Sequence, residues 1–144
     1  MDPNNPVVRL CQAGMQAEFA DDPAGARQLF EQAWAAARDD YEACLAAHFL
    51  ARHQPGPAET LRWNQAALDR AAAADPALVA GFYPSLYLNL GFAWELCGDQ
   101  RRARRCYEQA EAASAGLPAG AYGALVRGGV AAGLGRTAGR EEEQ

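Results

Sequence analysis

Residues 84–117 read PSLYLNLGFAWELCGDQRRARRCYEQAEAASAGL, and this stretch decides the fold. In its first half, Tyr87, Leu90, Gly91 and Trp94 recur at helical spacing, and in its second half Ala103, Tyr107 and Ala110 do the same. The Gly98-Asp99 pair between them suits the end of one helix and the N-cap of the next. A connection this short predicts two antiparallel helices, a helical hairpin.

The composition extends this prediction to the whole chain of 144 residues. Alanine, the strongest helix former, makes up roughly a quarter of it, and isoleucine is absent. The length suits one domain with a genuine core. We therefore expect an all-α protein.

Proline marks the predicted helix starts, because it suits the first helical turn after an Asn or Asp N-cap. Asn5-Pro6, Asp22-Pro23 and Asp75-Pro76 are such pairs, and Gly56-Pro57 and Leu117-Pro118 also precede helix-forming runs. Seven helices are predicted, near 6–20, 23–37, 40–53, 57–73, 76–97, 100–114 and 118–134. Pro84 falls inside the fifth and is expected to kink it.

The spacing of residues 84–117 recurs earlier in the chain. The first hairpin carries Leu10, Ala13, Gly14 and Ala17, then Ala26, Phe30 and Ala33. The middle hairpin carries Cys44, Ala47, His48 and Ala51, then Thr60, Asn64 and Ala67. Small residues let two helices approach closely, and the aromatic fills the gap between hairpins. His48 stands where the other hairpins have glycine, so a wider crossing is expected there, with Trp63 partly replacing the missing aromatic at Asn64.

These patterns resemble the tetratricopeptide repeat, whose unit of about 34 residues has the same aromatic, Leu-Gly and Ala-x-x-x-Phe signature. The resemblance implies a right-handed solenoid of about three repeats, near 7–40, 41–83 and 84–117, closed by a capping helix at 118–134. Residues 1–135 would form a single domain, followed by a flexible acidic tail at 136–144. The longer middle repeat is similar to those of bacterial regulatory proteins.

The capping helix is rich in glycine and therefore poor in helix propensity. Tyr122, Leu125, Val126 and Val130 are spaced along one face. We expect the packing of that face to hold the helix together.

In the family, the first helix of each repeat lines a concave groove. Carried onto this sequence by position, the resemblance implies a partner-binding groove formed by Met15, Glu18, Leu45, Phe49, Arg52, Leu88, Asn89, Phe92 and Glu95. Apolar anchors of this kind bind an apolar peptide or an amphipathic helix. The same residues could instead only pack against neighbouring helices.

Three functions follow as hypotheses. The first is a protein-protein interaction module that binds a peptide or helix in this groove. The second is a self-assembling homodimeric module, because an apolar patch and weakly capped solenoid ends favour two-fold association. The third is a sensor or adaptor domain of a bacterial regulatory system, which rests on fold-level analogy.

Other classes are disfavoured by the sequence. No enzyme, cofactor or metal site is expected, because His48 and His53 are five residues apart and no phosphate loop or GxSxG elbow occurs. A net charge of −5 argues against nucleic-acid binding. The N-terminal residues lack a signal-peptide pattern and no stretch is apolar enough for a membrane span, so a cytoplasmic location is expected.

Two groups of side chains receive ordinary structural interpretations. Each of the four cysteines (Cys11, Cys44, Cys97 and Cys106) is expected to be a small core residue. The cluster of Arg101, Arg102, Arg104 and Arg105 is expected to be a solvated helix face paired with Glu108 and Glu111, with an acidic partner as the alternative.

Overall fold

The computed structural model describes residues 2–139, and within that range the chain contains helices and turns and no strand. The all-α prediction is confirmed. The chain divides into two compact units, Met1–Val79 and Ala80–Gln144. We call them the N-terminal and C-terminal units and describe each by itself, whereas the sequence predicted one domain over residues 1–135.

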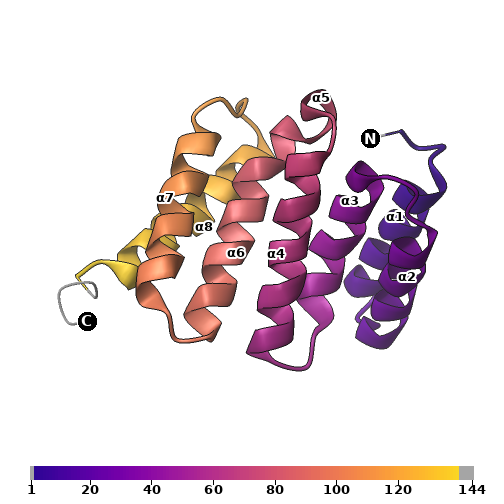
Figure 1. Cartoon of the computed structure of the whole chain (residues 1–144), viewed down its shortest axis with the longest axis horizontal. Helices are drawn as coiled ribbons and strands as arrows, with labels where there is room; N and C mark the ends of the chain where they lie inside the picture. The colour runs from indigo at the N-terminus through magenta and orange to yellow at the C-terminus, as the bar shows by residue number, and fades with distance from the viewer. Residues whose placement is uncertain (1, 140–144) are drawn as a thin grey trace. The chain divides into compact units, whose positions relative to one another are not determined.

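The N-terminal unit consists of two helical hairpins (Figure 1). Its elements are α1 (Pro6–Phe19), α2 (Pro23–Ala36), α3 (Asp40–Leu50), the 3₁₀ turn η1 (Ala51–His53), α4 (Pro57–Ala73) and the short α5 (Pro76–Val79). Helix α1 packs against α2, and α3 packs against both α4 and α2. The predicted helix 40–53 is therefore helical throughout, but its last turn tightens into a 3₁₀ turn.

The C-terminal unit consists of one hairpin and a final helix. Its elements are the 3₁₀ turn η2 (Ala80–Phe82), α6 (Tyr83–Leu96), α7 (Gln100–Ser114) and α8 (Ala121–Thr137). Helix α8 packs against α7 and α6. The single kinked helix predicted for 76–97 is wrong: the segment forms α5, η2 and α6. Pro84 lies in the first turn of α6, where its missing N–H needs no helical acceptor.

Polar side chains cap α1, α2, α3 and α7, and the caps of α1, α2 and α7 were predicted. The Asn5 side chain accepts hydrogen bonds from the backbone N–H groups of Val7 and Val8 at 2.8 and 3.1 Å. The Asp22, Asp39 and Asp99 carboxylates each accept one bond from the backbone three residues on, at 3.0, 2.8 and 2.9 Å. These bonds satisfy amide groups that a helix leaves unpaired at its start.

A glycine facing an aromatic ring brings the two helices of each terminal hairpin together. The Phe30 ring lies against Gly14, and the Tyr107 ring lies against Gly91. Both rings are fully buried. The glycines are 77 residues apart, as are the aromatics and the capping residues Asp22 and Asp99, so α1–α2 and α6–α7 repeat one arrangement.

The middle hairpin lacks that pair. Asn64 is buried, and its side-chain amide donates a hydrogen bond to the Thr60 carbonyl at 3.0 Å. This buried polar group therefore finds its hydrogen-bond partner within α4. The neighbouring Trp63 packs edge-on against Trp34 of α2, with ring centroids 5.0 Å apart. An aromatic contact between successive hairpins is therefore kept, one residue away from the expected position.

Helix α8 differs from its prediction in position and in its buried face. It begins and ends three residues later than predicted, so Arg136 and Thr137 are helical, while residues 140–144 of the predicted tail lie outside the described residues. Val126 and Val130 are buried as expected, but Tyr122 is 44% and Leu125 75% exposed. Cys97 is also exposed, whereas the other three cysteines are buried.

We expect the substitution Gly91→Ala to destabilise the C-terminal unit. The added Cβ would lie 2.7 Å from Cε1 of the buried Tyr107 ring, so the helices must separate, at a cost of about 1–3 kcal/mol. Gly135→Ala in α8 is the matched control, because no atom lies within 4 Å of its Cβ position. Urea unfolding measures both, and a Gly91→Ala variant as stable as the wild type would refute the close crossing.

Candidate functional site

The predicted groove residues divide between the two units. Five of them (Met15, Glu18, Leu45, Phe49 and Arg52) belong to the N-terminal unit, and four (Leu88, Asn89, Phe92 and Glu95) belong to the C-terminal unit. The site is therefore described as two local surfaces.

In the N-terminal unit, Glu18 joins the first helices of two successive hairpins. Its Oε1 accepts a hydrogen bond from Nη2 of Arg52 at 2.6 Å, and its Oε2 lies 2.6 Å from Nε2 of His53. The Arg52 guanidinium also covers the Phe49 ring, 4.7 Å from its centroid. Glu18 and Arg52, both predicted as groove residues, are thus brought together as an ion pair.

The apolar residues beside this ion pair are mostly buried. Leu45 is 4% and Phe49 7% exposed, and the Phe49 ring stacks on Phe30 with centroids 5.1 Å apart. Met15 is only partly buried. Leu45 and Phe49 therefore belong to the core of the unit. Of these three apolar groove residues, Met15 is the one whose side chain is partly accessible to solvent.

The C-terminal unit repeats the ion pair. The Glu95 carboxylate accepts hydrogen bonds from the Arg136 guanidinium at 3.0 and 3.1 Å and from the Tyr107 hydroxyl. Burial and the bond to Glu95 raise the pKa of the Tyr107 phenol. Glu95 lies 77 residues after Glu18, so the same position of the first helix carries the carboxylate in both units.

Of the other residues predicted in this unit, Phe92 is the most open. Leu88 is partly buried against the cluster of Ala110, Val126 and Val130. Asn89 is also partly buried, while Phe92 is 51% exposed.

An apolar pair recurs at the same positions on the first helix of each unit, and three of its four side chains are exposed. Phe92 and Leu96 occupy one face of α6, four residues apart, at 51% and 47% exposure. Their equivalents 77 residues earlier are Met15 and Phe19, and Phe19 is 97% exposed. Phe19 and Leu96 were missed from the sequence, although their spacing from Met15 and Phe92 was the available signal. We name these two pairs the repeated apolar surface.

The N-terminal unit also contains a buried carboxylate, Glu42. Glu42 is 2% exposed and accepts hydrogen bonds from the Asn5 side chain at 2.8 Å and from the Arg38 backbone at 2.9 Å. The Arg38 guanidinium adds an ion pair at 3.2 Å. Burial by itself would raise the pKa of Glu42, but the bonds from Arg38 and Asn5 outweigh it and hold that pKa below 4.5.

The histidines do not form a shared polar site. Nδ1 of His48 is inaccessible to solvent and has no hydrogen-bond partner among the described residues. Burial and the nearby Arg52 lower the pKa of His48 to about 4, so it is neutral at pH 7. His53 is engaged with Glu18. Residues 2–139 contain no group of three His, Cys, Asp or Glu side chains placed to hold a metal ion.

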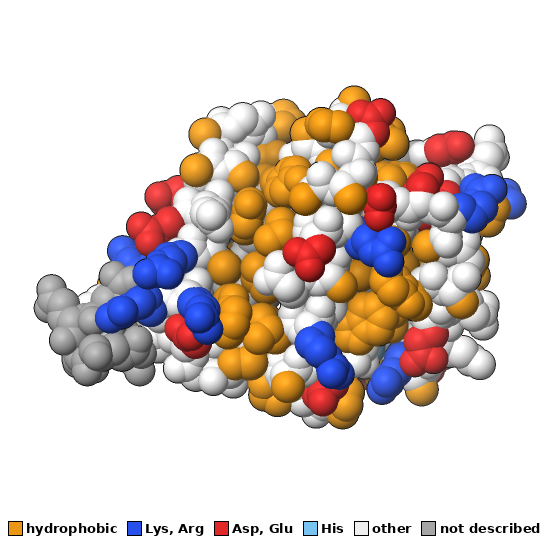
Figure 2. Space-filling model, viewed as in Figure 1, with side chains coloured by type: hydrophobic (Ala, Val, Ile, Leu, Met, Phe, Trp, Pro, Cys, Tyr) orange, Lys and Arg blue, Asp and Glu red, His pale blue; other side chains and the backbone are white. Residues whose placement is uncertain are grey.

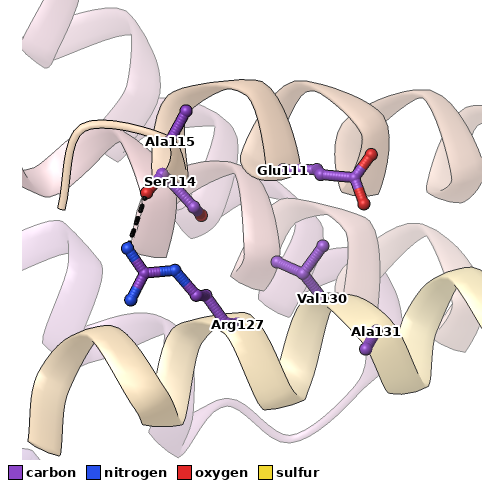
Figure 3. Close-up of a pocket in the computed structure, with 6 residues that line it drawn as sticks. All are labelled: Glu111, Ser114, Ala115, Arg127, Val130 and Ala131. Carbon is purple, nitrogen blue, oxygen red and sulfur yellow. Dashed lines mark hydrogen bonds between the residues drawn. The ribbon is translucent and has the colours of Figure 1, made fainter. Parts of the chain in front are cut away.

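A small hollow of about 270 Å³ lies between α7 and α8 (Figure 3). It is lined by Glu111, Ser114, Ala115, Arg127, Val130 and Ala131. The Arg127 guanidinium donates to the carbonyls of Ser114 and Leu117 at 3.1 and 2.8 Å. We name this feature the α7–α8 hollow.

The arginine cluster lies on α7, where basic side chains gather on the face drawn in Figure 2. Arg101, Arg102 and Arg105 are exposed. Arg102 pairs with Asp99 at 3.4 Å and covers the Trp94 ring, and Arg104 donates to the Leu134 carbonyl at 3.2 Å. Three of the four arginines are exposed, as expected for a solvated helix face, and the bond of Arg104 to Leu134 was not predicted.

Comparison of the chain with protein-family models, with curated proteins and with solved structures gave no match. Among the described residues, no helix is both long enough and apolar enough to cross a membrane.

Phe49 and Phe92, which the sequence placed together in one groove, should respond differently to truncation. We expect Phe49→Ala to cost about 3–5 kcal/mol of the free energy of unfolding, because it leaves a cavity beside Phe30. Phe92→Ala removes a half-exposed ring and should change that free energy by less than about 1 kcal/mol. Chemical denaturation of the two variants tests this difference, and equal losses would contradict it.

The Glu42 carboxylate should make the stability of the protein depend on acid pH. Because its pKa is lowered on folding, its contribution is fully present above its ordinary pKa of 4.5 and is lost as the pH falls below that value. We expect Glu42→Gln to cost about 1–3 kcal/mol at neutral pH and to reduce the acid dependence. Urea unfolding between about pH 3 and 7 measures both effects, and an unchanged pH profile would contradict this role.

Proposed function

We propose that this chain is a tetratricopeptide-like interaction module that acts in the cytoplasm by binding a protein segment rather than by catalysis. The observation that carries the proposal is the repeated apolar surface. A peptide or amphipathic helix with apolar side chains is the ligand that such a surface suits.

The first argument is exposure at equivalent positions. Phe19, Phe92 and Leu96 are large apolar side chains that remain 97%, 51% and 47% exposed. Single exposed apolar residues need no explanation, but Phe19 and Leu96 are exposed at the same position of two units, which is a repeated feature. Aromatic side chains of this kind carry most of the binding energy at interfaces.

The second argument is charge. Glu18 and Glu95 lie one residue before Phe19 and Leu96, and each is paired with an arginine, Arg52 or Arg136, at 2.6 and 3.0 Å. The carboxylates beside the apolar pairs are therefore neutralised within their own units. A ligand does not need a complementary basic residue there, so an apolar segment is favoured over a charged one.

Affinity capture from the native cell extract, read by quantitative mass spectrometry, tests this function. We expect the partner captured by the wild type to be lost with Phe92→Glu, because a carboxylate replaces the apolar anchor, and to be reduced with Phe19→Glu. A loss of at least 30-fold in affinity, about 2 kcal/mol, is typical of such an anchor.

Leu78→Glu is the matched control, because Leu78 is 53% exposed, lies on α5 and belongs to neither apolar pair. Circular dichroism confirms that each variant keeps its helical content. Equal capture by the wild type, Phe19→Glu and Phe92→Glu would show that the repeated apolar surface does not bind the partner.

A further inference from the structure

Helix α7 carries its charges in an order that is unfavourable for the helix itself. Its first six residues contain four arginines, and the glutamates Glu108 and Glu111 follow in its second half. The N-terminus of a helix carries partial positive charge, so carboxylates stabilise it and arginines do not. Arg101 and Arg105 are also four residues apart, where like charges repel each other. Helix stability therefore does not explain these arginines.

The equivalent helix of the N-terminal unit shows that the hairpin does not need them either. At the offset of 77 residues, three of the four arginines align with uncharged residues of α2, and the pairs are Arg101 with Ala24, Arg102 with Gly25 and Arg105 with Gln28. Helix α2 forms the same glycine–aromatic contact with its partner helix without those three charges. We name Arg101, Arg102 and Arg105 the basic α7 face.

The basic α7 face is open to solvent, and two of its guanidiniums are unpaired. All three side chains are exposed. Arg102 is held by Asp99 at 3.4 Å and lies over the Trp94 ring, 4.9 Å from its centroid. Within residues 2–139, Arg101 and Arg105 form no hydrogen bond or ion pair. The three arginines and Asp99 line an open hollow of about 430 Å³.

The charge around this face is positive, although the whole chain is acidic. Residues 80–139 contain six arginines and four Asp or Glu residues, whereas residues 1–79 contain six arginines and eleven Asp or Glu residues. A surface of one charge attracts and orients a partner of the opposite charge. The ligand that complements the basic α7 face is therefore an anion.

We propose that the basic α7 face binds an acidic segment of a partner protein, in which carboxylates at alternate positions pair with Arg101 and Arg105. The Cβ atoms of residues four apart on a helix are about 5–6 Å apart. In an extended segment, side chains two residues apart point the same way at a spacing of about 6.6 Å. A guanidinium donates two parallel hydrogen bonds to one carboxylate, so each unpaired arginine can hold one acidic side chain.

Carboxylates are favoured here over the phosphates of a nucleic acid. Single strands are held by basic side chains together with aromatic rings on which the bases stack. The aromatic ring in contact with this face, Trp94, is covered by the Arg102 guanidinium instead. The net charge of −5 on the whole chain also opposes a long run of phosphates. The face contains no residue of the repeated apolar surface and does not rest on the proposed function.

The experiment is an NMR titration of the ¹⁵N-labelled full-length chain with acetyl-hexaglutamate amide. We expect amide shifts to change along the first half of α7, with a dissociation constant of about 0.1–1 mM at an ionic strength of about 20 mM. An ionic strength of about 200 mM should weaken the binding, because salt screens exposed charges. Acetyl-hexaglutamine amide is the uncharged control peptide and should cause no such changes.

The double variant Arg101→Gln/Arg105→Gln should raise the dissociation constant about 10-fold or more. Its melting temperature should not fall, because both charges oppose the helix that carries them. The matched control is Arg9→Gln/Arg62→Gln, which removes the same charge from α1 and α4. Arg9 and Arg62 are likewise exposed and unpaired within residues 2–139, and this control should leave the dissociation constant nearly unchanged.

Four results would overturn the proposal. One is the absence of shift changes at about 5 mM hexaglutamate. Another is an equal loss of affinity in both double variants, which would show attraction by overall charge alone. Tighter binding of a thymidine oligonucleotide to the same arginines would assign the face to nucleic acid. Binding seen only after Glu141, Glu142 and Glu143 are replaced by Gln would assign it to the chain's own carboxylates.

Discussion

A glycine in contact with an aromatic ring sets the distance between paired helices at both ends of this chain. Gly14 admits the Phe30 ring and Gly91 admits the Tyr107 ring, and no larger residue leaves room for either. Two further contacts depend on this close approach of the paired helices. Phe49 stacks on Phe30, and Gly133 brings α8 onto Tyr107. Each aromatic thus joins a hairpin to the helix after it.

The ion pairs build on the same arrangement. Glu18 and Glu95 follow their glycines by four residues, one helical turn, and each receives an arginine from the helix that packs on the aromatic. In the N-terminal unit, the Glu18 carboxylate is also hydrogen-bonded to His53. In the C-terminal unit, the Glu95 carboxylate also accepts a hydrogen bond from the Tyr107 hydroxyl. A partly buried carboxylate is stabilised when its oxygens are bonded to charged donors, so these pairs are compatible with the apolar side chains beside them.

Small residues explain why few binding features stand out. Alanine and glycine allow helices to pack closely, but their small side chains leave shallow surfaces that offer a ligand little contact area. Against that background, the exposed large side chains are distinct: Phe19, Phe92 and Leu96 on the first helices, and Leu125 on α8. In each unit, the exposed side chains on the first helix suit contact with a protein segment.

The sequence by itself determined the helices and their pairing, because these follow from local forces. Asn5, Asp22 and Asp99 cap helices wherever they precede a helix-forming run, and a period near 3.6 residues marks an apolar face. It also placed Glu18 and Arg52 among the residues of one groove, because equivalent positions of successive repeats are expected to lie close together.

Only the tertiary structure decided which apolar residues are covered. Phe49 and Phe92 occupy the same repeat position, yet Phe49 stacks on Phe30 in the core of its unit and Phe92 is half exposed. Leu125 and Val126 are neighbours in sequence with opposite exposure, because α7 and α6 contact just one side of α8. Burial depends on contacts between distant segments, and periodicity alone cannot say which face of a uniformly apolar helix its neighbours cover.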